Sequence, residues 1–162
     1  GQGDQTARTY PVKVTLPGMA AEVGAGADFS CARVGANVYC WGASGAGQIG
    51  IGNPSQNTDG CINFCKLSPA QVLTAAATPL AGIVELEVGY QGGCGRRADG
   101  SLGCWGTGAG YFAGPLSIAA QQVKEVVELS TCSSAPLTSS LRYLDQSDQL
   151  RHGASVITQV CP

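Results

Sequence analysis

The sequence contains little charge and few aromatic residues. Charged residues make up 12% of the 162 residues, and the formal net charge is −2. No basic run is present, which argues against nucleic acid as a partner, because phosphate binding needs clustered lysine and arginine. Apolar runs also stay shorter than the roughly 18 residues that a membrane helix requires. We therefore expect neither nucleic-acid binding nor membrane insertion.

Motifs for catalysis are equally scarce. The single histidine, His152, is not accompanied by a serine in a nucleophile motif. Asp145 and Asp148 are close in sequence, but a general acid–base pair also needs a shaped site around it. The glycine-rich stretch 43–52 lacks the Gly-Lys-Ser/Thr ending of a phosphate loop. We predict a protein that is not an enzyme, with no catalytic residues and no cofactor.

Potential metal ligands are few. A zinc site needs closely spaced Cys/His pairs, and Cys61 with Cys65 could supply one such pair. Asn53, Asn57 and Asp59 could offer oxygens to calcium, but only one of them is a carboxylate. We predict no metal site, with zinc at the cysteines and calcium at the oxygens as the alternatives.

Glycine and cysteine are abundant instead. The 24 glycines favour many turns and short strands over long helices. The eight cysteines, an even number, are too many for an ordinary cytosolic protein and indicate an oxidising compartment. No signal peptide is visible, and Gly1 is interpreted as a mature N-terminus from which an export signal has been removed. We predict a secreted or cell-surface protein, folded as one domain over residues 1–162.

Residues 26–42 predict a β-hairpin that is closed by a disulfide. A two-residue turn that begins at Gly35 places Cys31 directly opposite Cys40. Glycine suits the first position of a type II′ turn, which needs a positive φ. The two cysteines then form a non-hydrogen-bonded pair with Cα atoms about 4.5 Å apart, a separation that a disulfide accepts. We predict this disulfide, with free buried thiols as the alternative.

Residues 89–106 repeat this pattern with one additional residue between the cysteines. A three-residue loop over 98–100, with Gly100 in the left-handed position of a type I turn plus G1 bulge, absorbs the additional residue. Cys94 then lies opposite Cys104. Two different loop lengths thus give the same pairing, so a second disulfide is predicted here.

A third, degraded copy of the hairpin is predicted over 132–144. It begins at Cys132, and its second cysteine position falls near Tyr143, so Cys132 lacks a partner within the copy. The remaining cysteine, Cys161, is therefore paired with Cys132.

The copies define blade-like repeats. A repeat of about 40 residues with several short strands and a tryptophan after a strand is typical of a propeller blade. Glycine-rich crossings follow the first two hairpins at 43–52 and 107–114, and the first blade carries an insertion over 53–69 that a Cys61–Cys65 disulfide closes on itself. The predicted strands flanking the hairpins cover 10–15, 83–88, 123–129 and 156–161, and the predicted blades cover 10–70, 71–122 and 123–162.

The first hairpin and its crossing resemble the repeat of the regulator of chromosome condensation family of β-propellers, in an exported bacterial, disulfide-containing variety. The resemblance implies four-stranded blades used as a binding platform, and no residue here carries over the nucleotide-exchange or β-lactamase-inhibiting activities of that family. Trp41 and Trp105 are interpreted as blade-packing residues rather than as ligand platforms. The second copy departs at Tyr111-Phe112, and the third matches in outline. The matching residues are Gly26, Cys31, Ala32, Tyr39, Cys40, Trp41, Gly42, Gly47, Gln48, Ile49 and Gly50, then Gly89, Cys94, Asp99, Gly100, Cys104, Trp105 and Gly106.

Three copies leave an open arc, because propellers typically need at least about four blades. Unpaired strand edges in such an arc bind other strands. We predict an all-β, partial or oligomer-completed propeller of about three blades, whose arc is completed by another copy, another chain or further sequence, or by contact between the strands at 10–15 and 156–161. The predicted function is a non-catalytic extracellular assembly subunit of a filament, sheath or surface complex. The alternative is a secreted protein-binding module or inhibitor that uses its loop face.

Two groups of residues are predicted to contact protein partners. The N-terminal strand would add to a blade of a neighbouring molecule through its edge. Two arginines that flank the second hairpin tip would meet an acidic partner, with a solvated face as the alternative. These residues are Tyr10, Val12, Val14, Arg96 and Arg97.

Overall fold

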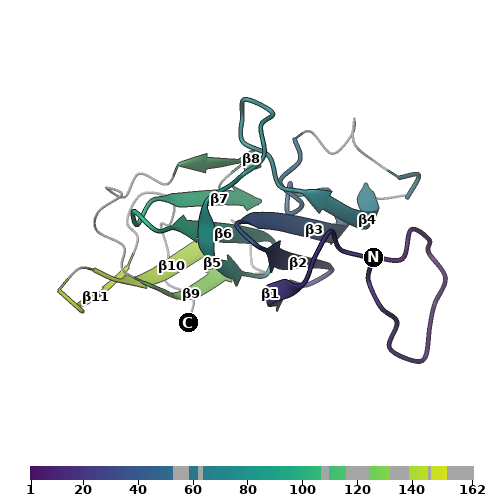
Figure 1. The fold of residues 1–162 in the computed structure, drawn as a ribbon, viewed down its shortest axis with the longest axis horizontal. Helices are drawn as coiled ribbons and strands as arrows, with labels where there is room; N and C mark the ends of the chain where they lie inside the picture. Colours follow the sequence, from purple (N-terminus) through teal and green to yellow (C-terminus); the bar gives the residue numbers. More distant parts are fainter. Residues whose placement is uncertain are drawn as a thin grey trace.

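A computed structural model of the protein describes residues 1–52, 59–61, 64–106, 110–115, 125–131, 139–145 and 147–152. Within these ranges every regular element is a β-strand, and the strands form three separate antiparallel sheets (Figure 1). In each sheet the strands pair in their order along the chain. The fold is therefore all-β and propeller-like with about three blades, as the sequence predicts.

We call the three sheets the first, second and third blades. The first blade contains β1 (Ala20–Ala25), β2 (Phe29–Val34), β3 (Asn37–Ala43) and β4 (Cys65–Gln71). The second contains β5 (Ile83–Val88), β6 (Gly92–Arg97), β7 (Leu102–Gly106) and β8 (Gly110–Pro115). The third contains β9 (Glu125–Thr131), β10 (Ser139–Leu144) and β11 (Leu150–His152).

Both predicted hairpins have the predicted register. Cys31 pairs with Cys40 across β2 and β3, and Cys94 pairs with Cys104 across β6 and β7. Each pair is joined by a disulfide with a Cα–Cα distance of 4.1 Å. The turns differ as expected, because Gly35 has a φ of 58° in the two-residue turn and Gly100 has a φ of 83° in the longer one. Turn geometry and cysteine spacing therefore determined these two hairpins correctly.

The first strand of the first blade lies further along the chain than predicted. Residues 10–15 form no strand, and β1 supplies the strand that pairs with β2. The alternating pattern at 10–15 is interrupted at Pro11, which has no N–H for a ladder hydrogen bond. The strand assignment at 10–15 is therefore wrong, and this segment lies beside the blade as an extended loop, dark purple in Figure 1.

Two predicted loops contain strands instead. The last part of the predicted insertion 53–69 belongs to β4, which pairs with β3. The predicted second crossing, 107–114, contains most of β8, which pairs with β7 and completes the second blade. Both segments pair with a neighbouring strand, and this tertiary pairing outweighs their loop-like glycine and proline content.

The third hairpin copy was placed incorrectly. Tyr143, predicted to stand near the second cysteine position, lies on β10, the second strand of the third blade. The residue of β10 that corresponds to Cys31 is Ser140. Each of them lies two residues before the arginine that pairs with the glutamate after the bulge. The predicted Cys132–Cys161 pair and the predicted strand at 156–161 lie outside the described residues.

The main hydrophobic core lies between the first two blades. It joins side chains from β2 and β3 to side chains from β5 and β7, and it includes the Cys31–Cys40 disulfide. β5 contacts β1 and β2, and β9 contacts β5 and β6, so each blade meets the next through its first strand. The core residues are Phe29, Cys31, Val38, Cys40, Ile49, Ile51, Val72, Leu80, Ile83, Leu86 and Trp105.

Candidate functional site

All three blades repeat one feature at the start of their first strand. One additional residue forms a bulge there, and the next residue is a glutamate that is paired in register with an arginine on the neighbouring strand. In the first two blades the side chains of these residues form ion pairs. The pairs are Glu22 with Arg33, Glu85 with Arg96, and, by register, Glu128 with Arg142.

The glutamate of the first blade also contacts the second blade. Oε1 of Glu22 accepts from Nε of Arg33 at 3.1 Å, and Oε2 accepts from the backbone N–H of Leu86 at 2.6 Å. Arg33 thus orients the carboxylate of Glu22, which accepts a hydrogen bond from a β5 N–H group that points away from its own sheet. A charged acceptor makes this a stronger bond than one between neutral groups.

The second blade donates two further hydrogen bonds to the first. The backbone N–H of Ile83 donates to the carbonyl oxygen of Ala36 at 3.0 Å, in the β2–β3 turn. Nε1 of Trp105 donates to the carbonyl oxygen of Gln48 at 2.9 Å. Together with Leu86 N–H, these bonds form a set of three donors that the second blade directs at the first.

The glycine-rich crossing of the first blade is shaped to receive Trp105. Its turn is closed by a hydrogen bond from Gly50 N–H to Gly47 O at 2.9 Å, and Ile49 is fully buried. Gly50 has a φ of 70°, and a Cβ atom there would lie 2.9 Å from the indole ring. The crossing therefore has a packing role, which supports the interpretation of the stretch 43–52 as structural.

The first blade has residues equivalent to the three donor residues of the second blade, on the side that faces away from the second blade. Ala20, Val23 and Trp41 correspond to Ile83, Leu86 and Trp105 in register and in sequence order. We call these three residues the open face. Their surroundings differ from those of their counterparts, because Val23 is 74% exposed whereas Leu86 is 8% exposed.

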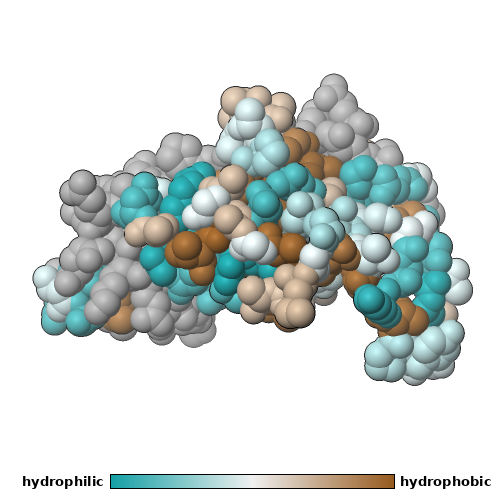
Figure 2. Space-filling view, viewed as in Figure 1, coloured by the Kyte–Doolittle hydropathy of each residue, from teal (hydrophilic) through white to brown (hydrophobic). Residues whose placement is uncertain are grey.

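Part of the N-terminal segment lies against the open face. A Cβ atom built on Gly1 would be 2.8 Å from Nε1 of Trp41, and burial lowers the pKa of the Gly1 amino group. The N–H of Gly3 donates to the carbonyl oxygen of Leu67 in β4 at 2.9 Å. The segment is otherwise largely exposed and forms an open loop at one end of the molecule (Figure 2).

The structure separates the predicted partner-binding residues into two groups. Tyr10 and Val12 are exposed, at 67% and 38%, and lie on the N-terminal loop rather than on a strand edge. Val14 lies near Gly1 on the same loop. Edge pairing through these residues therefore lacks the strand that the prediction assumed.

The two arginines already have partners within the chain. Arg96 forms an ion pair with Glu85, and Nε of Arg97 donates to the carbonyl oxygen of Ala81 at 3.0 Å. Arg97 also contacts the side chain of Ser101. The side chains thus hold the start of β5 and the β6–β7 turn in place.

Burial raises the pKa of Glu87, and repulsion by Glu85 and Glu22 adds to this effect. The opposite shift occurs at Asp99, where hydrogen bonds from Ser101 lower the pKa of the carboxyl group. The first strands of the first two blades thus place three carboxylates near one another, and the pKa of one of them, Glu87, is raised.

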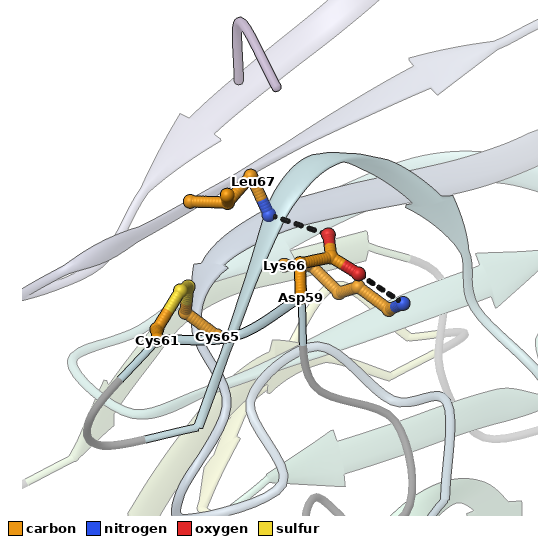
Figure 3. The surroundings of a disulfide bond; sticks show 5 residues. All are labelled: Asp59, Cys61, Cys65, Lys66 and Leu67. Carbon is orange, nitrogen blue, oxygen red and sulfur yellow. Dashed lines mark hydrogen bonds and ion pairs between the residues drawn. A yellow bond between two sulfur atoms is a disulfide. The ribbon is translucent and has the colours of Figure 1, made fainter. Parts of the chain in front are cut away.

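The Cys61–Cys65 disulfide closes the insertion as predicted (Figure 3). Beside it, the carboxylate of Asp59 accepts from Nζ of Lys66 at 2.8 Å and from Leu67 N–H at 2.9 Å. Although burial opposes the shift, these bonds lower the pKa of Asp59. The carboxylate considered for calcium thus anchors the start of β4, and Asn53 and Asn57 lie outside the described residues.

The residues considered for catalysis lie around the β10–β11 turn. Oδ1 of Asp145 accepts from the backbone N–H groups of Ser147 and Gln149, at 2.8 and 3.1 Å, and so shapes the turn. His152 is the last residue of β11. Among the described residues there is no group of three or more His, Cys, Asp or Glu side chains that could hold a metal ion.

Three disulfides in a chain of this size indicate an oxidising compartment. Within the described part of the chain there is no helix with the length and apolarity that crossing a bilayer requires.

The repeated glutamate is the feature that sequence reasoning missed. The segments Ala-Ala-Glu-Val at 20–23, Ile-Val-Glu-Leu at 83–86 and Val-Val-Glu-Leu at 126–129 are visible in the sequence. The predicted first strand at 10–15 leaves the segment 20–23 outside any strand, so the sequence prediction does not align it with 83–86.

The chain is similar to solved β-propeller structures. No family model and no curated protein sequence matches it. Human WBSCR16 matches with a TM-score of 0.63 and 18% identity, over 85% of this chain and 33% of that one. Prp20p from Saccharomyces cerevisiae, a propeller of the regulator of chromosome condensation type whose structure was described with its binding to Gsp1p and histones, matches with a TM-score of 0.56 and 13% identity, over 72% and 30%. The chain thus spans about a third of the length of either structure, and the similarity shows a propeller-type fold.

Proposed function

We propose that the protein is a secreted, non-catalytic subunit that associates with other protein chains to build an extracellular assembly. One observation supports the proposal above all: the first blade exposes at Val23 the position that the second blade buries at Leu86. Exposed apolar side chains at a repeated packing position favour association, because burial removes apolar surface from water. The disulfides are consistent with an extracellular location.

A binding module that captures a different protein is the second candidate. The similarity to Prp20p favours it, since that structure was described together with binding to Gsp1p and histones. In this case the loops at one end of the blades would form the contact surface, as a platform for a foreign protein.

Mass in solution discriminates the two candidates. Purified, oxidised protein is passed over a size-exclusion column with multi-angle light scattering at several loading concentrations. The assembly subunit is expected to show a mass that rises above the 16.4 kDa of one chain. A constant single-chain mass at every concentration would contradict the assembly proposal and leave the binding module.

A further inference from the structure

We propose that the open face of the first blade binds the third blade of a second copy of this chain. This inference rests on the proposed function and specifies the surface and the partner through which the copies associate. In this interface, the third blade of one copy and the first blade of the next would make the same kind of contact as the first and second blades make within one chain.

The backbone at the open face is oriented for this contact. Val23 pairs with Ala32, and Ala32 pairs on its other side with Tyr39. Hydrogen-bonded pairs alternate from the β2–β3 turn, so Ala32 directs its N–H and C=O toward Tyr39. The N–H of Val23 therefore points away from the sheet, as the N–H of Leu86 does where it donates to Glu22.

The side chains of the open face leave apolar surface that the equivalent interface buries. Trp105 is 1% exposed, whereas its counterpart Trp41 is only half-buried, with Gly1 against the indole. Ser30 stands opposite Trp41, where Gly93 stands opposite Trp105, so the two indoles have different neighbours on the adjacent strand. A docking blade would cover the exposed part of Trp41 and displace Gly1.

The third blade supplies the matching acceptor position. β9 repeats the bulge of β1, and Glu128 follows that bulge as Glu22 does in the first blade. Each glutamate is paired in register with an arginine, Arg142 in the third blade and Arg33 in the first. One chain thus carries the donor position at its first blade and the acceptor position at its third, which favours a second copy over an unrelated partner.

The test uses sedimentation velocity on the complete 162-residue protein over a hundredfold range of concentration. Val23→Glu places a carboxylate where the incoming acceptor is expected, and Val84→Glu is the matched control, because Val84 is 42% exposed on the second blade. We expect Val23→Glu to raise the apparent Kd at least about tenfold, since like charges and a lost apolar contact oppose docking. Val84→Glu should associate as the wild-type protein does.

A second variant guards against an effect on folding. Val23→Pro removes the outward N–H and fixes φ but keeps an apolar side chain without added charge, a change that an edge strand tolerates. Thermal melting checks that both variants are folded. Glu128→Gln should weaken association as well. If the wild-type protein associates and Val23→Glu and Val23→Pro associate equally well, this interface is wrong while the assembly function stands. If the wild-type protein stays a single chain at every concentration, both are wrong.

Discussion

Nε1 of Trp105 lies 2.9 Å from the carbonyl oxygen of Gln48, and this hydrogen bond joins the second blade to the crossing of the first. The indole is almost fully buried, so no water replaces the donor when it is removed. Trp105→Phe should therefore lower the free energy of unfolding by about 1–3 kcal/mol, because it leaves a buried acceptor without its partner.

Trp41→Phe is the control for that substitution. The two tryptophans occupy the same position after their cysteines, but Trp41 is only half-buried. We expect a change within about 0.5 kcal/mol for a surface position of this kind. Urea denaturation of both variants measures the difference, and equal losses would show that the bond to Gln48 does not stabilise the contact between blades.

Gly50 should tolerate no side chain. Its φ of 70° disfavours other residues, and a Cβ atom would also lie 2.8 Å from Cγ1 of Val72. At Gly35, φ is 58° but nothing lies within 4 Å of the added Cβ. Gly35→Ala should cost about 1–2 kcal/mol from backbone conformation alone, and Gly50→Ala about 1–3 kcal/mol more from overpacking. Thermal denaturation in parallel tests this order, which reversed values would contradict.

The disulfide connectivity can be measured by peptide mapping. Non-reducing peptide mapping should find Cys31 joined to Cys40, Cys94 to Cys104 and Cys61 to Cys65. Loop closure of this length contributes about 2–3 kcal/mol for each hairpin disulfide. Replacing Cys94 and Cys104 together by serine should lower stability by that amount, while a bridge from Cys31 to any other cysteine would refute the hairpin register.

Glu87 should make the protein more stable at mildly acidic pH than at neutral pH. Its folded-state pKa lies above the ordinary value of 4.5, so the folded state holds the proton more tightly than the unfolded state. Ionisation as pH rises through the raised pKa therefore costs stability. Glu87→Gln should raise the melting temperature at pH 7 relative to the wild-type protein, and the advantage should shrink toward pH 4.

A charge control separates this effect from a change in net charge. Asp28→Asn removes one negative charge at an exposed turn position. It should shift the melting temperature equally little at pH 7 and pH 4. If Glu87→Gln and Asp28→Asn behave alike, burial of Glu87 among carboxylates has no effect on folding.

Removing the N-terminal loop should expose the open face. Deleting residues 1–15 takes away Gly1 beside Trp41 but no strand. We expect stronger association than in the complete chain and a nearly unchanged melting temperature. Light scattering and thermal melting of the truncated protein measure both, and weaker association would show that the loop itself contributes to the contact.

The hairpins could be predicted from sequence because their constraints are local. Gly35 and Gly100 determine the type of turn in their hairpins, and the type of turn determines which cysteines lie opposite each other on the two strands. The strand at 83–88 was also predicted with its observed bounds, since it alternates and is rich in β-branched and other apolar residues.

The first strand could not be identified in the same way. Apart from Val23, β1 consists of alanine, glycine and Glu22, which have weak strand preference, and it forms because β2 pairs with it. The alternating segment at 10–15 has the stronger local pattern but no neighbouring strand. Whether 10–15 or β1 forms the first strand therefore depends on pairing with another strand rather than on local sequence. Pairing with β3 and β7 likewise makes β4 and β8 strands.

Neighbouring residues of β1 serve opposite sides of the first blade. Glu22 accepts a hydrogen bond from the blade that follows, and Val23 directs its N–H to the side on which none of the three described blades lies. A twofold axis through the open face would bring donor against donor. Association through this face, as proposed, would therefore be heterologous, and its rotation angle would decide between a closed cyclic ring and an open filament with two unlike ends.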